Sequence, residues 1–492
     1  MNNVILMFAL PLLAAFLIQT LWRALGPLSR FVGPLTLLAT GIIGLRAWPV
    51  VTEQPAAIAI GNFAPPLGIT FYVDRLALLF ALIVAFGMLA LWPWGKVEDR
   101  PRTDSILLIL AAAATGMALS GDLFNLYVFY ELVAVATYGL IVSGGRAPAY
   151  AATFRYLIIS AFGAALALIG IALVYTLTGT LNLAHLAEVA PDLLNNPMGL
   201  AAFGLFLIGF GVKAELFPVN TWVPEVYPSV PQRVAGLLAG VVSKLALIVI
   251  VRVMLLVFPF EGAHLLMLAL GIAGVVFGEL SAWRARDLSR TLGFSSIGQL
   301  GVMFIAFSVP GEAGLLAGLA VALHHTAVKP ALFLLAERWG GSLARLKGAA
   351  GDSPLAAGLF VLLALSLIGI PPLPGFWAKL LTLVALFDQA HPLYLIGAGV
   401  ILVGAVFETA YLFRIATGLY GTADAGQPGR ETHDWADLLT AGALGAALLA
   451  GVVLLAPLGQ QLTGIAAQTA DRGLYVQTVH PTLPTFVIGQ TP

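Results

Sequence analysis

Apolar runs of about twenty residues follow one another along nearly the whole of this 492-residue chain. A helix of that length crosses the hydrocarbon core of a bilayer, because each residue advances it by about 1.5 Å. Sixty per cent of the residues are hydrophobic and only 10% are charged, whereas a soluble domain carries about 25% charged residues. The sequence therefore predicts an all-α polytopic membrane protein, with residues 1–492 forming a single integral membrane domain.

The apolar runs predict about fourteen membrane-spanning helices. The turn-like Ser120-Gly121-Asp122 divides the long run 104–143 into two spans. The first run lacks a basic n-region and an evident cleavage site, so we interpret it as a span and not as a signal peptide. The predicted spans cover residues 4–22, 31–51, 72–94, 104–120, 121–143, 153–178, 198–223, 231–258, 263–283, 291–309, 312–337, 355–385, 393–418 and 436–457.

Lys and Arg alternate between the two ends of these spans. The odd-numbered loops carry them, for example Arg284, Arg286 and Arg290 in the ninth loop, whereas the even-numbered loops 52–71 and 179–197 contain none. Basic residues gather in cytoplasmic loops of membrane proteins. The alternation therefore predicts that both termini lie on the non-cytoplasmic side. A short surface helix is expected within 179–197.

Proline interrupts two of the predicted spans. Pro218 follows Lys213 in span seven, and the run Pro371-Pro372-Leu373-Pro374-Gly375 precedes Lys379 in span twelve. Broken helices at matching positions are typical of transporters built from inverted repeats. We therefore expect two five-helix repeats, 104–258 (spans four to eight) and 263–418 (spans nine to thirteen). A break frees backbone groups that only protein or water can satisfy, so each one predicts a hydrated pocket. The alternative is that both are ordinary proline kinks.

Several ionisable side chains lie well inside the predicted spans. Glu131 is about ten residues from either end of span five, which places it about 15 Å deep. Such groups are costly within a bilayer and usually mark an ion path. The candidate proton path consists of Glu131, Lys213, Lys244, His325, Lys329 and Lys379, with His324, Glu215 and Glu408 as further candidates.

Spacing suggests partners for some of these groups and leaves others open. Glu131 and Lys213 are the natural couple of the first repeat, with a purely structural ion pair as the alternative. His325 and Lys329 are four residues apart and share a helix face, which suits a proton relay. The alternative for His325 is a core histidine bonded to a carbonyl group. The sequence leaves two roles for Glu408, a functional one and a structural pair with Arg414.

The partner of Glu215 is also open, between Lys244 and the helix break itself. Asp74 and Asp122 are expected at the membrane interface, near the ends of their spans.

Four segments resemble one known family, the proton-translocating antiporter-like subunits of respiratory complex I, membrane-bound hydrogenases and Mrp-type multisubunit Na⁺/H⁺ antiporters. They are GDLFNLYVFYEL (121–132), KAELFPVNTWVPEVYPSVP (213–231), SSIGQLGVM (295–303) and HHTAVKPALF (324–333). The segment LFNLYVF (123–129) is most similar to the D-type subunit of the Mrp antiporters. The resemblance implies a fourteen-span fold in a prokaryotic cell (inner) membrane, with a hydrated axis of Glu and Lys residues at mid-membrane.

The resemblance also implies roles for individual residues. Glu131 falls on the family's essential glutamate, Lys213 on its span-seven lysine and Lys244 on its span-eight lysine. Lys329 and Lys379 fall on the distal lysines, and His325 is implied as a relay.

The chain departs from the family pattern in the segment after Lys213. Asn220 and Tyr227 stand where histidines are common, Glu225 replaces an aspartate, and Glu215 is an added charge. Residues 458–492 contain many Pro, Gly and Thr and little apolar period, so we expect no long helix there. That argues against the complex I subunit that carries a long lateral helix.

The predicted function is translocation of H⁺, alone or in exchange for Na⁺, by one membrane subunit of a larger assembly. The alternative is a stand-alone secondary transporter of a small polar solute, but the charges follow successive spans and do not converge on one pocket. We expect no metal and no cofactor, because the chain has no Cys and no GxGxxG motif. It would then have no chemistry of its own, although it could serve a redox-driven proton pump. The expected partners are other membrane subunits and lipid, and the zero net charge gives no reason to expect nucleic acid.

Overall fold

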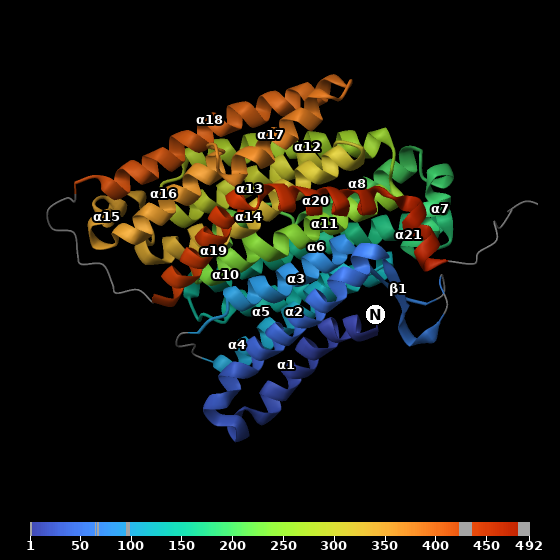
Figure 1. Cartoon of the computed structure of the whole chain (residues 1–492), viewed down its shortest axis with the longest axis horizontal. Coiled ribbons are helices and arrows are strands. Elements are labelled where there is room, and N and C mark those ends of the chain that lie inside the picture. Colours follow the sequence, from blue (N-terminus) through green and yellow to red (C-terminus); the bar gives the residue numbers. More distant parts are fainter. Residues whose placement is uncertain (1, 64, 66–67, 95–98, 423–434, 481–492) are drawn as a thin grey trace, which may run out of the picture.

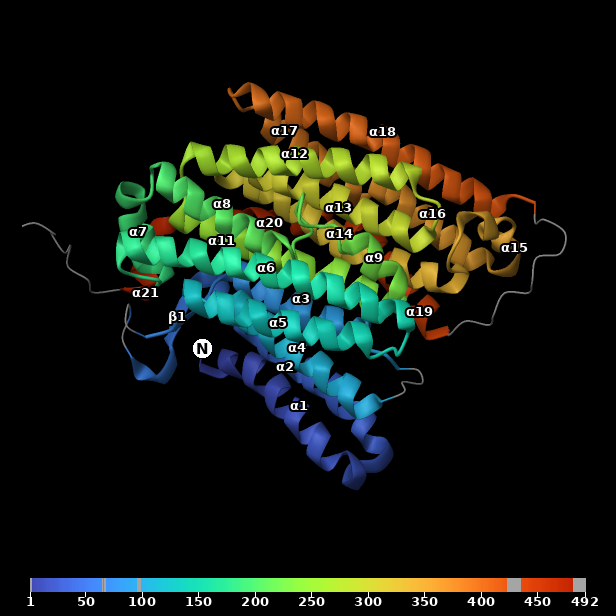
Figure 2. The ribbon, with the colours of Figure 1, turned by 180° about the vertical axis from the view of Figure 1, so that it is seen from behind.

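The computed structural model describes residues 2–63, 65, 68–94, 99–422 and 435–480. Long helices lie side by side with their axes roughly along one direction (Figures 1 and 2). The α-helices of the first half of the chain, long and short, are α1 (Leu6–Leu25), α2 (Ser29–Glu53), α3 (Arg75–Ala90), α4 (Arg100–Leu119), α5 (Leu123–Val142), α6 (Ala147–Thr178), α7 (Leu183–Leu193), α8 (Pro197–Gly211), α9 (Val223–Val226), α10 (Gln232–Leu237) and α11 (Ser243–Val257).

The second half is also helical. Its helices are α12 (Glu261–Arg284), α13 (Leu288–Phe307), α14 (Gly311–Trp339), α15 (Ala349–Asp352), α16 (Pro354–Ile368), α17 (Pro374–Phe387), α18 (Pro392–Tyr420), α19 (Trp435–Val453), α20 (Leu455–Ala470) and α21 (Arg472–Val479). Among the described residues, nine helical segments are long and apolar enough to cross a membrane, and four shorter apolar helices accompany them. Each of the fourteen predicted spans contains at least one helix, while the number of crossings stays a prediction.

Several local expectations are confirmed. α4 ends at Leu119 and α5 begins at Leu123, so the turn at Ser120-Gly121-Asp122 does separate two helices. α7 lies within 179–197, where a short helix was expected. Spans seven and twelve are each interrupted, between α8 and α9 and between α16 and α17.

Two segments differ from the sequence prediction. The loop 52–71 contains part of a small antiparallel hairpin, β1 (Ala56–Ala59) with β2 (Thr70–Val73), in which Ala56 pairs with Val73. Residues 458–480 are largely helical, because α20 continues beyond α19 and α21 follows it; 481–492 lie outside the described residues. Tertiary contacts hold this segment: the Gln468 side chain accepts from the Arg75 amide at 2.8 Å and donates to the Val51 carbonyl at 3.1 Å. Such contacts can outweigh a weak local pattern.

A short antiparallel β-bridge, called a backbone tie below, fixes the start of one helix in each half of the chain. Asp122 caps α5 and forms an antiparallel bridge with Asn182, and Asp287 caps α13 and forms an antiparallel bridge with Ser342. In both places two backbone hydrogen bonds flank the bridge, at 2.9 Å each in the first and at 3.0 and 2.9 Å in the second. Each tie fixes the start of a helix against the segment that follows the next long helix.

Asp74 is buried within the protein at the start of α3, and its expected position at the membrane interface stays a prediction. It caps α3 through the Ala77 amide at 2.8 Å and accepts two hydrogen bonds from Arg252 of α11, at 2.7 and 2.8 Å. The rings of Tyr72 and Tyr475 pack beside this pair, with centroids 3.8 Å apart and their planes tilted by 33°. The pair therefore joins the hairpin, α3 and α11 to the C-terminal helix α21. Both figures place α21, β1 and the start of α1 at the same end of the bundle.

We predict that Asp74→Ala lowers the free energy of unfolding in detergent by about 3–5 kcal/mol, because it leaves a buried guanidinium without its carboxylate. Arg252→Met should be costly for the converse reason. The double variant should lose less than the sum of the two single losses, as measured by denaturant unfolding of the purified protein. Additive losses would contradict a direct interaction.

Candidate functional site

The interruption of span seven holds Lys213 in a non-helical segment. α8 ends at Gly211, and regular helix returns only at Val223. The indole of Trp222 donates to the freed carbonyl of Val212 at 2.9 Å, and the Asn220 amide donates to the carbonyl of Glu215 at 3.2 Å. Glu215 has a φ of 55°, a left-handed conformation that is uncommon for a residue with a side chain. Side chains thus satisfy two carbonyl groups of the break, and backbone hydrogen bonds such as Leu216 to Gly211, at 2.8 Å, satisfy others.

Lys213 is buried among groups from three helices. Its Nζ donates to the Ser160 hydroxyl of α6 at 3.2 Å and lies 3.3 Å from the ring centroid of Tyr130 on α5. Tyr130 is itself fixed by a 2.7 Å hydrogen bond to the carbonyl of Gly209. The ammonium thus has one oxygen partner and one aromatic face, an arrangement that stabilises a cation away from water.

Glu131 follows Tyr130 on α5 and supplies the opposite charge that acts on Lys213. Its Oε1 atom is buried and has no hydrogen-bond partner within the described part of the chain. Within the described residues the predicted couple forms no ion pair: the oxygen that accepts from Lys213 comes from Ser160, and Glu131 acts on the lysine only through its charge.

The hydrogen-bond partner of Glu215 is Tyr227, whose hydroxyl donates to Glu215 Oε1 at 2.5 Å. The charges of Lys244 and, more weakly, Lys329 also act on Glu215. Its Oε2 is buried and has no partner among the residues that the structure covers. Two departures from the family pattern, Glu215 and Tyr227, are thus in direct contact with each other.

Lys244 follows a wider helical turn. The π turn Leu238–Val242 joins α10 to α11 and leaves the carbonyl of Ala239 able to accept from both Lys244 and the Ser243 hydroxyl. Lys244 Nζ also lies 3.2 Å from that hydroxyl. Pro330 of α14 packs so closely on Gly240 that a Cβ there would lie 2.4 Å from its ring. Such π turns are frequent at functional sites.

α14 carries both His325 and Lys329 in the interior. The charges of Lys244 and Lys329 act on His325, whose two ring nitrogens have no hydrogen-bond partner among the described groups. The structure therefore contains no hydrogen bond from His325 to a carbonyl group among the described residues, which was the alternative for this histidine. Lys329 Nζ donates to α13, to the Ser295 hydroxyl at 2.7 Å and the Leu292 carbonyl at 3.1 Å. His324 pairs with Ser366 of α16 at 2.9 Å.

Lys379 lies after the second break and forms an ion pair. Its Nζ is 2.6 Å from Glu408 Oε2 of α18 and 3.0 Å from the carbonyl of Ile368, the last residue of α16. Glu408 Oε1 accepts from Gln299 of α13 at 2.7 Å. Arg414 is not the partner of Glu408, because it donates instead to the carbonyls of Trp283 and Ala285.

Three buried charged residues were missed by the sequence analysis: Asp104, Arg252 and Glu279. Arg252 lies within predicted span eight and Glu279 near the end of predicted span nine. Arg252 stands inside an apolar run, the signal that identified the interior lysines, whereas Asp104 and Glu279 stand near the ends of their predicted spans.

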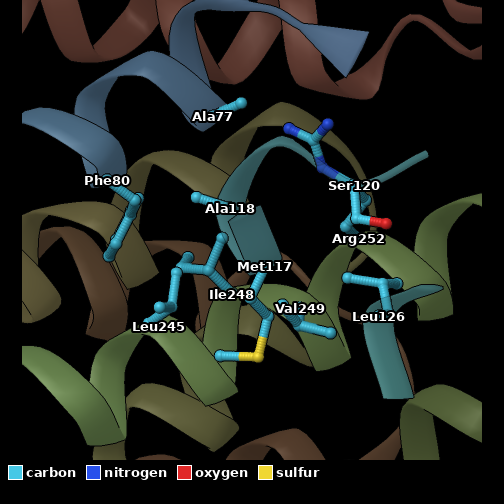
Figure 3. Close-up of a pocket in the computed structure, with 10 residues that line it drawn as sticks. All are labelled: Ala77, Phe80, Met117, Ala118, Ser120, Leu126, Leu245, Ile248, Val249 and Arg252. Carbon is cyan, nitrogen blue, oxygen red and sulfur yellow. The ribbon is translucent and has the colours of Figure 1, made fainter. Parts of the chain in front are cut away.

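A small cavity lies along α11 between Lys244 and Arg252 (Figure 3). Its volume of about 10 Å³ is close to that of one water molecule. Leu245, Ile248 and Met117 form apolar walls, and Ser120 and Arg252 are its polar residues. The row of interior lysines is thus separated from the buried Asp74–Arg252 pair by mostly apolar contacts.

The fold and the site together define a polytopic membrane protein with a row of interacting charges inside it. The family model described as NADH:quinone oxidoreductase/Mrp antiporter, TM matches residues 120–406. The chain belongs to this family of antiporter-like membrane subunits, and the resemblance noted in its sequence is confirmed.

Two curated relatives illustrate the range of the family. The chain is 33% identical to the N subunit of the NADH-quinone oxidoreductase of Desulforudis audaxviator, over 85% of this chain and 86% of the relative. It is 30% identical to the D-type subunit of the Na⁺/H⁺ antiporter of Alkalihalophilus pseudofirmus, over 82% and 84%. Identity alone therefore does not separate the two kinds of subunit.

Solved structures agree with this assignment. A chain of the membrane-bound sulfane sulfur reductase, an archaeal respiratory membrane complex, matches with a TM-score of 0.89 at 29% identity, over 97% of this chain and 100% of that one. A chain of the Mrp complex from a Dietzia species matches with a TM-score of 0.88 at 25% identity, over 97% and 99%. The predicted all-α polytopic fold class is confirmed.

We predict that Glu215→Gln reduces ion exchange by membrane vesicles about tenfold or more, because it removes the carboxylate that acts on both Lys244 and Lys329. Glu225→Gln is a matched control ten residues further along the same segment. Glu225 is partly exposed and pairs with the exposed Arg155, a type of pair worth about 0–1 kcal/mol. Equal exchange by the two variants would contradict the role assigned to Glu215.

Proposed function

We propose that this chain is the proton-translocating membrane subunit of a multisubunit antiporter or respiratory-type complex. It moves H⁺, alone or in exchange for Na⁺, along the axis Glu131, Lys213, Lys244, His325, Lys329 and Lys379. The observation that carries the proposal is the continuity of this series. Glu131 acts on Lys213, Glu215 acts on Lys244 and Lys329, and Glu408 acts on Lys329 and pairs with Lys379.

Tyr156 links the two parts of the series around the first break. Its ring stacks on Trp222 with centroids 4.2 Å apart, and the charges of both Glu131 and Glu215 act on it. The first carboxylate and the central one therefore influence the same side chain, with Lys213 in the intervening segment.

Serine hydroxyl groups accompany three of the four lysines. Lys213 donates to Ser160, Lys244 to Ser243 and Lys329 to Ser295. A hydroxyl group both donates and accepts hydrogen bonds, so it suits a position between a lysine that loses a proton and one that gains it. His325, between Lys244 and Lys329, has the same dual capacity when neutral.

Proton movement along this axis would use changes in the distance between opposite charges. A lysine close to a carboxylate is stabilised as the ammonium, whereas separation of the two favours release of its proton. Glu131 Oε1, Glu215 Oε2 and both nitrogens of His325 have hydrogen-bonding capacity that suits contact with water. The two helix breaks would supply further polar groups.

Partners and location follow from the relatives. Those of known name are subunits of an oxidoreductase and of an Na⁺/H⁺ antiporter, so we infer that this chain assembles with other membrane subunits in a prokaryotic cell membrane. The basic residues of the odd-numbered loops favour termini on the non-cytoplasmic side, and α21 and the start of α1 lie at the same end of the bundle, as one common side requires (Figures 1 and 2).

Two observations support inverted repeats over 104–258 and 263–418. The first is the matching pair of backbone ties at Asp122 and Asp287, and the second is the matching pair of breaks. The alternative function, a stand-alone solute transporter, is disfavoured because the charged groups extend from α5 to α18 and do not surround one pocket.

We predict that Glu131→Ala and Lys213→Ala each abolish ion-driven pH change in vesicles that contain the assembled complex, while membrane assembly stays near normal. Glu131→Asp should retain part of the activity, because it keeps the charge and loses one methylene group. Assembly can be followed by copurification of the partner subunits. Exchange at the wild-type rate by Glu131→Ala would refute the proposed axis.

A further inference from the structure

Glu279 of α12 is a buried carboxylate that none of the preceding steps uses. Its side chain fits a space left by glycine: a Cβ added to Gly298 of α13 would lie 2.2 Å from Glu279 Oε1. Gly404 of α18 lies on another side, where a Cβ would be 3.4 Å from Glu279 Cγ. Only 3% of the residue is exposed. Three helices thus meet around one carboxylate, and two of them have a glycine where it lies.

The charges of one other carboxylate, Glu408, and of two lysines, Lys379 and Lys329, act on Glu279. Lys379 is already paired with Glu408 at 2.6 Å, and Lys329 is held by Ser295 and Leu292. Both lysines thus already have oxygen partners, and within the described residues neither forms an ion pair with Glu279.

Two polar groups face each other here. Within the described part of the chain, neither Glu279 Oε2 nor the hydroxyl of Tyr411 forms a hydrogen bond of normal geometry, but the two side chains are close enough to interact. By contrast, both oxygens of Glu408 are bonded, one to Gln299 and one to Lys379. An unpartnered buried carboxylate is costly as an anion, so this position favours a group that takes up a proton.

The side of Glu279 away from Lys379 is apolar. A cavity of about 320 Å³ lies there between α12 and α18, lined by Val275, Leu280, Val403 and Phe407 together with Glu279. Figures 1 and 2 show α12 and α18 next to each other along one edge of the molecule. These walls offer no hydrogen bonds, so the groups of the chain whose chemistry suits proton exchange with Glu279 are Lys379, Glu408 and Tyr411.

We propose that Glu279 is a proton-carrying residue of the terminal site, which alternates with Lys379 in holding one proton beside Glu408. Transfer breaks one N–H bond of the Lys379 ammonium and forms one O–H bond on the Glu279 carboxylate. The products are a neutral amine and a carboxylic acid, so the net charge of the site does not change. This inference rests on the proposed function, because it gives the last lysine of the axis a proton acceptor.

Glu279→Gln separates this role from a packing role. Glutamine has nearly the same shape and fills the space above Gly298, but it cannot take up a proton. We expect exchange by the assembled complex to fall by at least about tenfold, as is usual for loss of a positioned proton-transfer group, and its pH profile to change. Glu279→Asp should retain part of the activity. Glu261→Gln, at the exposed start of the same helix, is the matched control.

A second measurement does not depend on transport. Infrared difference spectra of the purified complex, taken across the pH range of activity, should contain the carbonyl band of a protonated carboxylic acid that is absent in Glu279→Gln. Wild-type rate, pH profile and infrared spectrum in Glu279→Gln would overturn the inference. Lys213→Ala, measured in parallel, distinguishes failure of this inference from failure of the proposed function. If it is inactive while Glu279→Gln is normal, only this inference fails, whereas normal activity in both would refute the proposed function itself.

Discussion

A lysine ammonium in the interior of a membrane protein needs oxygen partners, and much of this structure is arranged to provide them. An isolated charge at that depth is expensive, whereas one bonded to hydroxyl, carbonyl or carboxylate oxygens is tolerated. Ser160, Ser243 and Ser295 provide a hydroxyl group to three lysines, and Glu408 provides a carboxylate to the fourth. None of these contacts uses more than a few oxygens, so each lysine keeps some freedom to change partners.

Irregular helix geometry provides most of the remaining oxygens. The second break frees the carbonyl of Ile368 for Lys379, and the π turn before α11 frees that of Ala239 for Lys244. Irregular backbone within a membrane protein is stable only where other groups satisfy it. Here the charged side chains and the backbone satisfy each other. The ties at Asp122 and Asp287 fix the ends of α5 and α13, the helices that carry Glu131 and Gln299.

The sequence predicted the helices and breaks well because both have strong local signals, apolar runs and proline. It also identified the interior lysines, since a charge in an apolar run is conspicuous. It did not identify Glu408 as the partner of Lys379, because that contact joins residues 29 positions apart across a helix boundary. The nearer Arg414 looked equally suitable. Glu279 and the hairpin β1–β2 were missed for a related reason: burial of the one and pairing of the other depend on tertiary packing, which leaves little trace in local sequence.

The central claim is that the lysines of the axis release and regain protons, and Lys379→Arg tests it most directly. Arginine keeps the positive charge and can still pair with Glu408, so the site remains folded and charge-balanced, but a guanidinium does not give up its proton at accessible pH. Exchange by vesicles containing the assembled complex should therefore be blocked nearly as completely in Lys379→Arg as in Lys379→Ala. Wild-type exchange in the arginine variant would show that Lys379 serves only as a fixed charge, and would contradict the account.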